Sequence, residues 1–408
     1  MSRRRLIPSL LFQLFLLSGP AFAQGAQPTP RGYFRYPAIH GDTIVFTAEG
    51  DLWRVGIQGG VAQRLTTHPA EEDQPAVSPD GQTVAFCASY EGPREVYSMP
   101  VMGGPPKRHT FEGGQAVVVG WTPDGRILYS TRRFSTLPNV QLVALDPATD
   151  ERTLIPLAQA SQGAYDPSGK VLYFTRLPFQ GSHTRRYQGG SVQNLWKYAA
   201  GASEAVPLTA DSPTTSKDAM PWRGRVYFAS DRDGVMNIWS MNEEGGDLRE
   251  HTHHADFNVQ SPSLDAGRIV YQHGADLWLL DVQSGDNHEI PIRLASDFDQ
   301  LREHWVEKPL DFVTSVHLSP TGDRLVMTAR GQVFVFPVEQ GRRVEATRSA
   351  EVRYRSARFL PGGKDLLTLS DESGEIELWT VPANGVGSAR QLTSDGKVLR
   401  WEAVPSPT

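Results

Sequence analysis

The sequence predicts an all-β fold in which a six-bladed β-propeller is followed by an incomplete second β-propeller. Three observations lead to this prediction: a short apolar motif that recurs along the chain, a proline–glycine turn upstream of many copies, and one interruption of the rhythm. Repeats of roughly 40–50 residues that are built from short strands are typical of propeller blades.

The recurring motif spans three residues, which we call the slot: a polar residue, an aliphatic residue and then a large apolar residue. Successive slots are 39 to 56 residues apart. Each blade is a small sheet that cannot bury its own faces, so one large side chain per blade is expected to fill the wedge between neighbours. We therefore interpret these side chains as core residues and not as ligand platforms. The third residues of the slots are Trp53, Tyr97, Val143, Trp196, Trp239, Trp278, Phe334 and Trp379.

Turn motifs precede most slots and indicate hairpins. Proline presets φ for the first turn position, and glycine supplies positive φ at the end of the turn. An apolar strand follows each turn, and several units close near a Leu-Thr pair, as at Leu65-Thr66. The turn motifs are Ser78-Pro79-Asp80-Gly81, Thr122-Pro123-Asp124-Gly125, Asp166-Pro167-Ser168-Gly169, Ser319-Pro320-Thr321-Gly322 and Leu360-Pro361-Gly362-Gly363.

The spacing of the slots predicts the domain organisation. Six units cover residues 32–293 and form the first propeller. Residues 294–309 are predicted to be a linker, because the longest gap between slots falls there. Residues 310–408 then hold two blades and the start of a third of a second, truncated propeller. A single ring of eight blades is the alternative.

The N-terminus has the pattern of a secretory signal peptide. Arg3, Arg4 and Arg5 precede an apolar run that ends before Ala21-Phe22-Ala23, a small-x-small cleavage site. The run is too short to span a bilayer, which takes about 20 apolar residues. We expect cleavage after Ala23, a flexible leader over residues 24–31, and a periplasmic or secreted protein with no membrane association after cleavage.

Composition excludes several function classes. The net charge is −6, whereas a nucleic-acid binder would carry a basic domain or stripe. The single cysteine, Cys87, excludes an intrachain disulfide framework and a cysteine-based metal site. His251-Thr252-His253-His254 falls where other units have a Leu-Thr pair and a polar loop, so it is interpreted as a loop. We predict no metal, no cofactor and no catalytic residues in this chain.

Two arginine pairs remain as candidate binding residues. Arg132-Arg133 follows a predicted strand of the third unit, and Arg185-Arg186 lies in the longest insertion of the array. A pair of guanidinium groups on a loop of an acidic protein could hold a carboxylate through bidentate hydrogen bonds. The alternative is that both pairs are solvated surface residues.

Several segments of the chain resemble the tricorn proteases. The opening run of residues 35–46 resembles the start of those proteins, as does its continuation through Asp51-Leu52-Trp53 into residues 59–66. Residues 119–126, residues 186–190 before Leu195-Trp196, and residues 268–272 before Asp276-Leu277-Trp278 add to the likeness, which covers nearly all of residues 32–408.

This resemblance implies a serine-type peptidase family that trims oligopeptides. Its members have a six-bladed propeller, a seven-bladed propeller and a serine-peptidase region that carries a PDZ domain, and they form homo-oligomers of hexamer size or larger. The propellers are thought to gate and channel peptides. The catalytic residues of the family would lie beyond Thr408, so whether this chain is itself an enzyme stays open.

The resemblance also implies a role for the arginine pairs. One pair in the first propeller is expected to anchor the C-terminal carboxylate of a peptide substrate. Arg132 and Arg133 match that pair best, and Arg185 and Arg186 are the second candidate. The signal peptide points to an exported branch of the family. The alternative function is a stand-alone periplasmic propeller that acts as a protein-interaction scaffold, like the TolB-type translocation protein.

Overall fold

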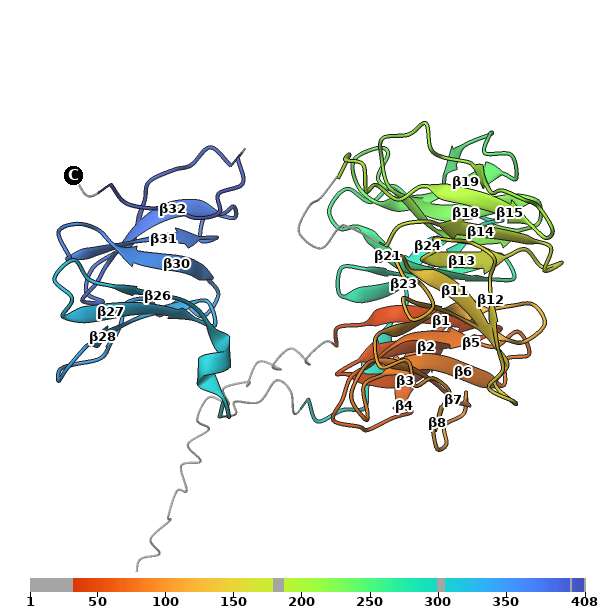
Figure 1. Ribbon diagram of the computed structural model, residues 1–408, viewed down its shortest axis with the longest axis horizontal. Coiled ribbons are helices and arrows are strands. Elements are labelled where there is room, and N and C mark those ends of the chain that lie inside the picture. Colours follow the sequence, from red (N-terminus) through yellow and green to blue (C-terminus); the bar gives the residue numbers. More distant parts are fainter. Residues whose placement is uncertain (1–31, 179–186, 299–304, 397, 407–408) are drawn as a thin grey trace, which may run out of the picture. The chain divides into compact units, whose positions relative to one another are not determined.

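The computed structural model describes residues 32–178, 187–298, 305–396 and 398–406 of the 408-residue chain. The predicted signal peptide and leader lie outside these residues. The chain divides into two compact units, Met1–Leu301 and Arg302–Thr408 (Figure 1). Nearly all regular structure in the described residues is β-strand, with one short 3-10 helix (η2, Pro309–Phe312) and no α-helix. The prediction of an all-β propeller chain is confirmed.

The described residues of the first unit form six sheets, each built from four consecutive antiparallel strands. The first three sheets contain β1 (Arg35–His40), β2 (Thr43–Ala48), β3 (Asp51–Gly56) and β4 (Gly59–Arg64); β5 (Glu72–Val77), β6 (Thr83–Ala88), β7 (Glu95–Pro100) and β8 (Lys107–Arg108); β9 (Ala116–Trp121), β10 (Ile127–Thr131), β11 (Gln141–Leu145) and β12 (Arg152–Leu154). The next three contain β13 (Gln162–Tyr165), β14 (Val171–Thr175), β15 (Leu195–Ala199) and β16 (Val206–Pro207); β17 (Ser216–Trp222), β18 (Arg225–Ser230), β19 (Asn237–Asn242) and β20 (Arg249–Glu250); β21 (Val259–Asp265), β22 (Arg268–His273), β23 (Asp276–Asp281) and β24 (Asn287–Glu289).

These six sheets close into a ring. The first strand of each sheet contacts the first strand of the next, and β21 of the sixth sheet contacts β1 of the first. The backbone N–H of Ile39 donates to Ser263 Oγ (3.2 Å) across this closure, and Arg268 pairs with Asp42 (2.9 Å). The contacts around this ring of six sheets all lie within the first unit.

A fifth strand locks the first sheet. β25 (Ile292–Leu294) leaves the sixth sheet and pairs in parallel with β4, with Ile292 opposite Gly60. Leu294 is buried in the same apolar cluster as Phe34 and Trp53. The end of the first unit is thereby tied to its beginning.

One hydrogen-bonded joint explains why the slot and the Leu-Thr pair occur together. The Thr side-chain oxygen accepts the backbone N–H of the aliphatic slot residue, which fixes the end of one strand against the start of another. The same Thr hydroxyl donates to a carboxylate or amide, which in most sheets is the first residue of the slot. The joints are Leu52–Thr66, Val96–Thr110, Leu195–Thr209, Ile238–Thr252, Val333–Thr347 and Leu378–Thr393, with N–O distances of 2.8 to 3.0 Å.

The second unit holds two sheets in its described residues. They contain β26 (Val313–Leu318), β27 (Arg324–Ala329), β28 (Gln332–Pro337) and β29 (Val344–Glu345); and β30 (Tyr354–Phe359), β31 (Asp365–Ser370), β32 (Glu377–Pro382) and β33 (Arg390–Gln391). Val326 and Val335 of the first sheet pack with Tyr354 and Phe359 of the second in one core. Among the described residues of the chain, no helix has the length and apolar character needed to cross a membrane.

Candidate functional site

One end of the first propeller collects the candidate binding residues. In every sheet of the ring, the hairpin between the second and third strands and the connection to the next sheet emerge at the same end, because neighbouring strands run in opposite directions. We call this end the front face. The described residues of its hairpins are 49–50, 89–94, 132–140, 176–178 together with 187–194, 231–236 and 274–275.

Arg132 and Arg133 are the first residues of the front-face hairpin between β10 and β11, and both are exposed. The backbone around them is held: the N–H of Arg133 donates to Thr131 Oγ1 (3.1 Å), and the N–H of Ser135 donates to the Arg132 carbonyl (3.3 Å). In the part of the chain that the structure describes, neither guanidinium forms an ion pair. Two positive charges on an anchored turn are therefore open to an anionic ligand.

Other arginines of the front face interact with neighbouring side chains. Arg35 pairs with Glu71 and Arg94 pairs with Asp73, each at 2.5 Å. The Arg176 guanidinium lies 5.1 Å from the ring centre of Trp196. The second candidate pair, Arg185 and Arg186, lies outside the described residues.

Aromatic side chains also gather on the front face. All exposed aromatic residues in the described part of the first unit belong to front-face connections or to the segment that enters β1. Phe134 directly follows the arginine pair and is 45% exposed. A face that offers arginine and exposed aromatic rings fits a ligand with both anionic and apolar parts. The exposed aromatic residues of this face are Tyr33, Phe111, Phe134 and Phe257.

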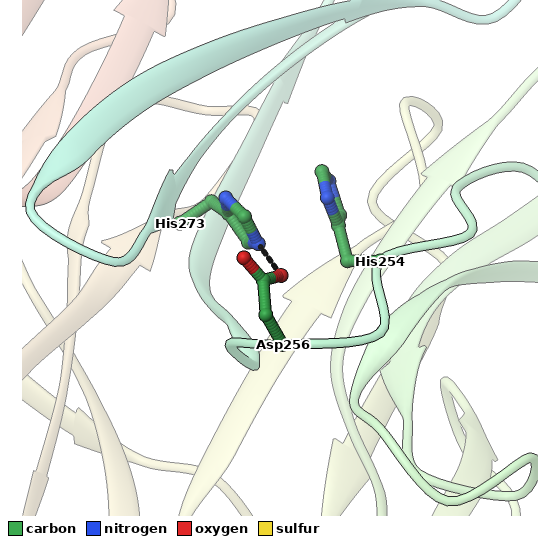
Figure 2. Close-up of side chains that lie close together, drawn as sticks. All are labelled: His254, Asp256 and His273. Atoms are coloured by element: carbon green, nitrogen blue, oxygen red, sulfur yellow. Dashed lines mark hydrogen bonds and ion pairs between the residues drawn. The ribbon is translucent and has the colours of Figure 1, made fainter.

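A second cluster on the front face consists of His254, Asp256 and His273 (Figure 2). His254 and Asp256 lie in the connection from β20 to β21, and His273 is the last residue of β22. His273 Nε2 lies 3.0 Å from Asp256 Oδ1, and the two imidazole rings stack with centroids 3.8 Å apart. One potential ligand atom from each residue lies within 4.8 Å of the others.

Neighbouring polar groups fix His254. Its backbone N–H donates to Asn237 Oδ1 (2.9 Å), the first residue of the slot in the fifth sheet. Its ring Nε2 contacts the Tyr271 hydroxyl (2.9 Å), which donates to Asn287 Oδ1 (2.7 Å). Burial, reinforced by the charge of His273, lowers the pKa of His254 to about 4, so its imidazole is neutral at pH 7.

Buried carboxyl groups lie behind the front face where the first and second sheets meet. Glu72 is fully buried and accepts hydrogen bonds from the Tyr90 hydroxyl (2.7 Å) and from Thr66 Oγ1 (2.9 Å). Asp51 pairs with Arg64 at 2.6 Å. Burial raises the pKa of Glu72 to about 7, because the charged form loses its hydration.

Ser98, His109 and Asp150 are linked in the same order as a catalytic triad, but here the serine is buried and the acid is exposed. Ser98 Oγ lies 2.7 Å from His109 Nε2, and His109 Nδ1 lies 2.5 Å from Asp150 Oδ1. The serine is the buried end and the acid is the open end, so a substrate carbonyl cannot reach the nucleophile. The same serine–histidine contact recurs as Ser240–His251 at 2.7 Å. Both pairs are structural links between strands of one blade.

Sequence reasoning found part of this face. It singled out Arg132 and Arg133 and considered His254, but it missed Asp256 and His273. Asp256 follows His254 by two residues and was within reach of a pattern search. His273 is 17 residues further along, at the end of another strand, and only the register of the sixth sheet brings it back.

Comparisons with known proteins identify the family. Residues 31–286 match the family model described as the tricorn protease N-terminal β-propeller domain. Tricorn protease homolog 1 of Streptomyces coelicolor is 30% identical over 390 residues, which cover 93% of this chain and 36% of that protein. A putative tricorn-like protease N-terminal subunit of Sulfurisphaera tokodaii is 28% identical over 174 residues, which cover 40% of this chain and 84% of that protein.

A solved structure gives the same answer for the fold. The crystal structure of the tricorn protease superposes with a TM-score of 0.65 at 21% sequence identity and covers 89% of this chain and 35% of that one. The chain spans about a third of the length of the first four curated relatives it matches. The family model covers more than half of the sequence, and the chain therefore belongs to the tricorn protease family.

Proposed function

We propose that this chain is the N-terminal, substrate-gating region of an exported tricorn-like serine peptidase. In this proposal the first propeller admits oligopeptides and directs them toward a catalytic region outside this sequence, which trims them. The chain itself supplies binding and not hydrolysis. Family membership and the arrangement of the front face support the proposal.

The observation that carries it is the arginine pair. Arg132 and Arg133 present guanidinium groups on a turn held by Thr131, without an ion pair among the described residues and beside exposed Phe134. A peptide C-terminus is a carboxylate next to a side chain of variable polarity. Arginine holds a carboxylate through two parallel hydrogen bonds, and a neighbouring apolar ring can contact the last side chain.

Peptide binding with two matched ligands tests this role. A fluorescent oligopeptide with a free C-terminal carboxylate is expected to bind more tightly than the same peptide with a C-terminal amide. Changing both arginines to alanine should remove that preference. The matched control changes Arg342 and Arg343 to alanine, because these residues form an exposed arginine pair in the second unit. Equal affinity for both peptides in the unchanged protein would contradict the proposed role.

Export and assembly are separate parts of the proposal. N-terminal sequencing of protein from the periplasm or medium should start at Gln24 if the signal peptide is cut after Ala23. The full-length protein is expected to form a homo-oligomer of hexamer size or larger, which light scattering can measure. Processing at another residue, or a monomeric full-length protein, would contradict the corresponding part.

A further inference from the structure

We propose that His254, Asp256 and His273 bind a divalent transition-metal ion of the zinc type. The three side chains come from two separate segments, and one potential ligand atom from each lies within 4.8 Å of the others (Figure 2). Zinc sites with three protein ligands keep a fourth position open for water or another ligand. The proposal does not depend on peptide binding by the same face.

The hydrogen bonds around His254 leave its Nδ1 free to act as the ligand. The Tyr271 hydroxyl has one proton and donates it to Asn287 Oδ1. Tyr271 must then accept from His254 Nε2, and the lone pair of the neutral imidazole lies on Nδ1. Histidine ligands of metal ions usually have the other ring nitrogen fixed by such a partner.

The other two residues, Asp256 and His273, lie close enough to share one ion after a small movement of a side chain. His273 Nε2 and Asp256 Oδ1 are 3.0 Å apart, close to the separation of two ligands that each lie about 2.0–2.2 Å from one zinc ion. The imidazole planes differ by only 25° and the ring centroids are 3.8 Å apart, so one ion cannot lie in both ring planes at once. Binding therefore requires the His273 ring to turn about its side chain while Tyr271 holds His254 in place.

The donor set selects the class of ion. Two imidazoles and one carboxylate favour Zn²⁺, Cu²⁺ or Ni²⁺ over Ca²⁺ and Mg²⁺, which prefer oxygen ligands. Trp278 contacts both imidazole rings edge-on, with centroid distances of 5.2 and 5.5 Å. This aromatic wall shields one side, whereas the Asp256 side chain is 65% exposed and leaves an approach from solvent.

Titration of the tag-free chain with Zn²⁺ by calorimetry tests the site, and Co²⁺ absorption reports its coordination. One ion per chain is expected at this site. His273→Ala and Asp256→Asn should each weaken binding at least about tenfold, because each removes a ligand. His253→Ala is the matched control: this neighbouring histidine is 75% exposed and pairs with Glu250, so affinity should stay within about twofold.

A fourth variant separates a built site from a chance cluster. Tyr271→Phe leaves all three ligands in place but removes the acceptor of His254 Nε2–H, and it should cost about 10-fold in affinity. Asp256 lies in an exposed connection, so the Asp256→Asn variant should fold normally. It therefore tests the site even if His273→Ala fails to fold. The proposal is overturned if Zn²⁺ does not bind, or if binding survives both Asp256→Asn and Tyr271→Phe unchanged.

Discussion

The first sheets of the two units are built alike but differ in what covers them. The sheet of β1–β4 lies between two neighbours, and its slot residue Trp53 is fully buried. The sheet of β26–β29 packs on one side against β30–β33, and its slot residue Phe334 is only half-buried. Neighbouring sheets do not set slot burial alone, because Trp196, Trp239 and Trp278 inside the closed ring are half-buried and Trp379 of the second unit is buried.

Strand register shows what the second unit leaves open. Val316, Met327 and Phe334 lie side by side in one row across β26, β27 and β28. Leu318, Leu325 and Phe336 form the next row on the same face. Val316 and Leu318 are 49% and 64% exposed. We call these six residues the open apolar face.

The largest expected effect comes from the slot residues. Trp53→Ala should lower the free energy of unfolding of the first unit by about 3–5 kcal/mol, because it leaves a large cavity in a fully buried position. Phe334→Ala should cost the second unit about 1–2 kcal/mol, since less area is lost from contact. Urea unfolding followed by hydrogen exchange in each unit measures both. Equal costs would mean that the two slots are equally covered in solution.

The closing strand gives the next largest effect. A Cβ at Gly59 would lie 2.4 Å from the Pro291 carbonyl oxygen, so Gly59→Ala should push β25 away from β4. Gly60→Ala is the control, because Gly60 also has positive φ but nothing lies within 4 Å of its Cβ position. We expect Gly59→Ala to cost about 1–3 kcal/mol more and to speed amide exchange in Ile292–Leu294. The same exchange rate in both variants would show that the pairing of β25 does not depend on the close approach of Gly59 to Pro291.

A smaller, pH-dependent effect is expected at Glu72. Its raised pKa means that the folded protein keeps a proton between about pH 4.5 and 7 that the unfolded chain has lost. The stability from this group is present below pH 4.5 and is lost as pH rises through 7. Glu72→Gln should flatten this part of the pH profile of unfolding free energy. An unchanged slope from pH 5 to 8 in the variant would rule out the assignment.

The smallest effect on stability is expected on the open apolar face. Leu318→Ser should change the unfolding free energy of the second unit by about 0.5 kcal/mol or less, because the side chain is mostly exposed. Binding of a hydrophobic dye by the chain should nevertheless fall, because exposed apolar patches bind such ligands. Val326→Ser, on the buried face of the same sheet, is the contrasting variant and should mainly destabilise. Unchanged dye binding in Leu318→Ser would place the dye elsewhere.

Local sequence predicted the parts of the fold that repeat. The slots, the turns and the Leu-Thr pairs are visible because each uses residues close together in the chain, and the Thr66–Leu52 joint shows their shared cause. The parallel pairing of β25 with β4 was not predicted, because three residues without a turn motif carry no signal of their partner. The metal cluster was missed for the same reason, since His273 joins it through sheet register.

The pairing of β25 with β4 also constrains the order of assembly. Ile292 lies opposite Gly60, 232 residues earlier in the chain. The outer edge of β4 stays bare until synthesis has delivered almost the whole first unit, and an unpaired edge is where two chains associate wrongly. Folding of the propeller therefore cannot finish from its N-terminal end, and the edge of β4 is the part of the ring that stays exposed longest.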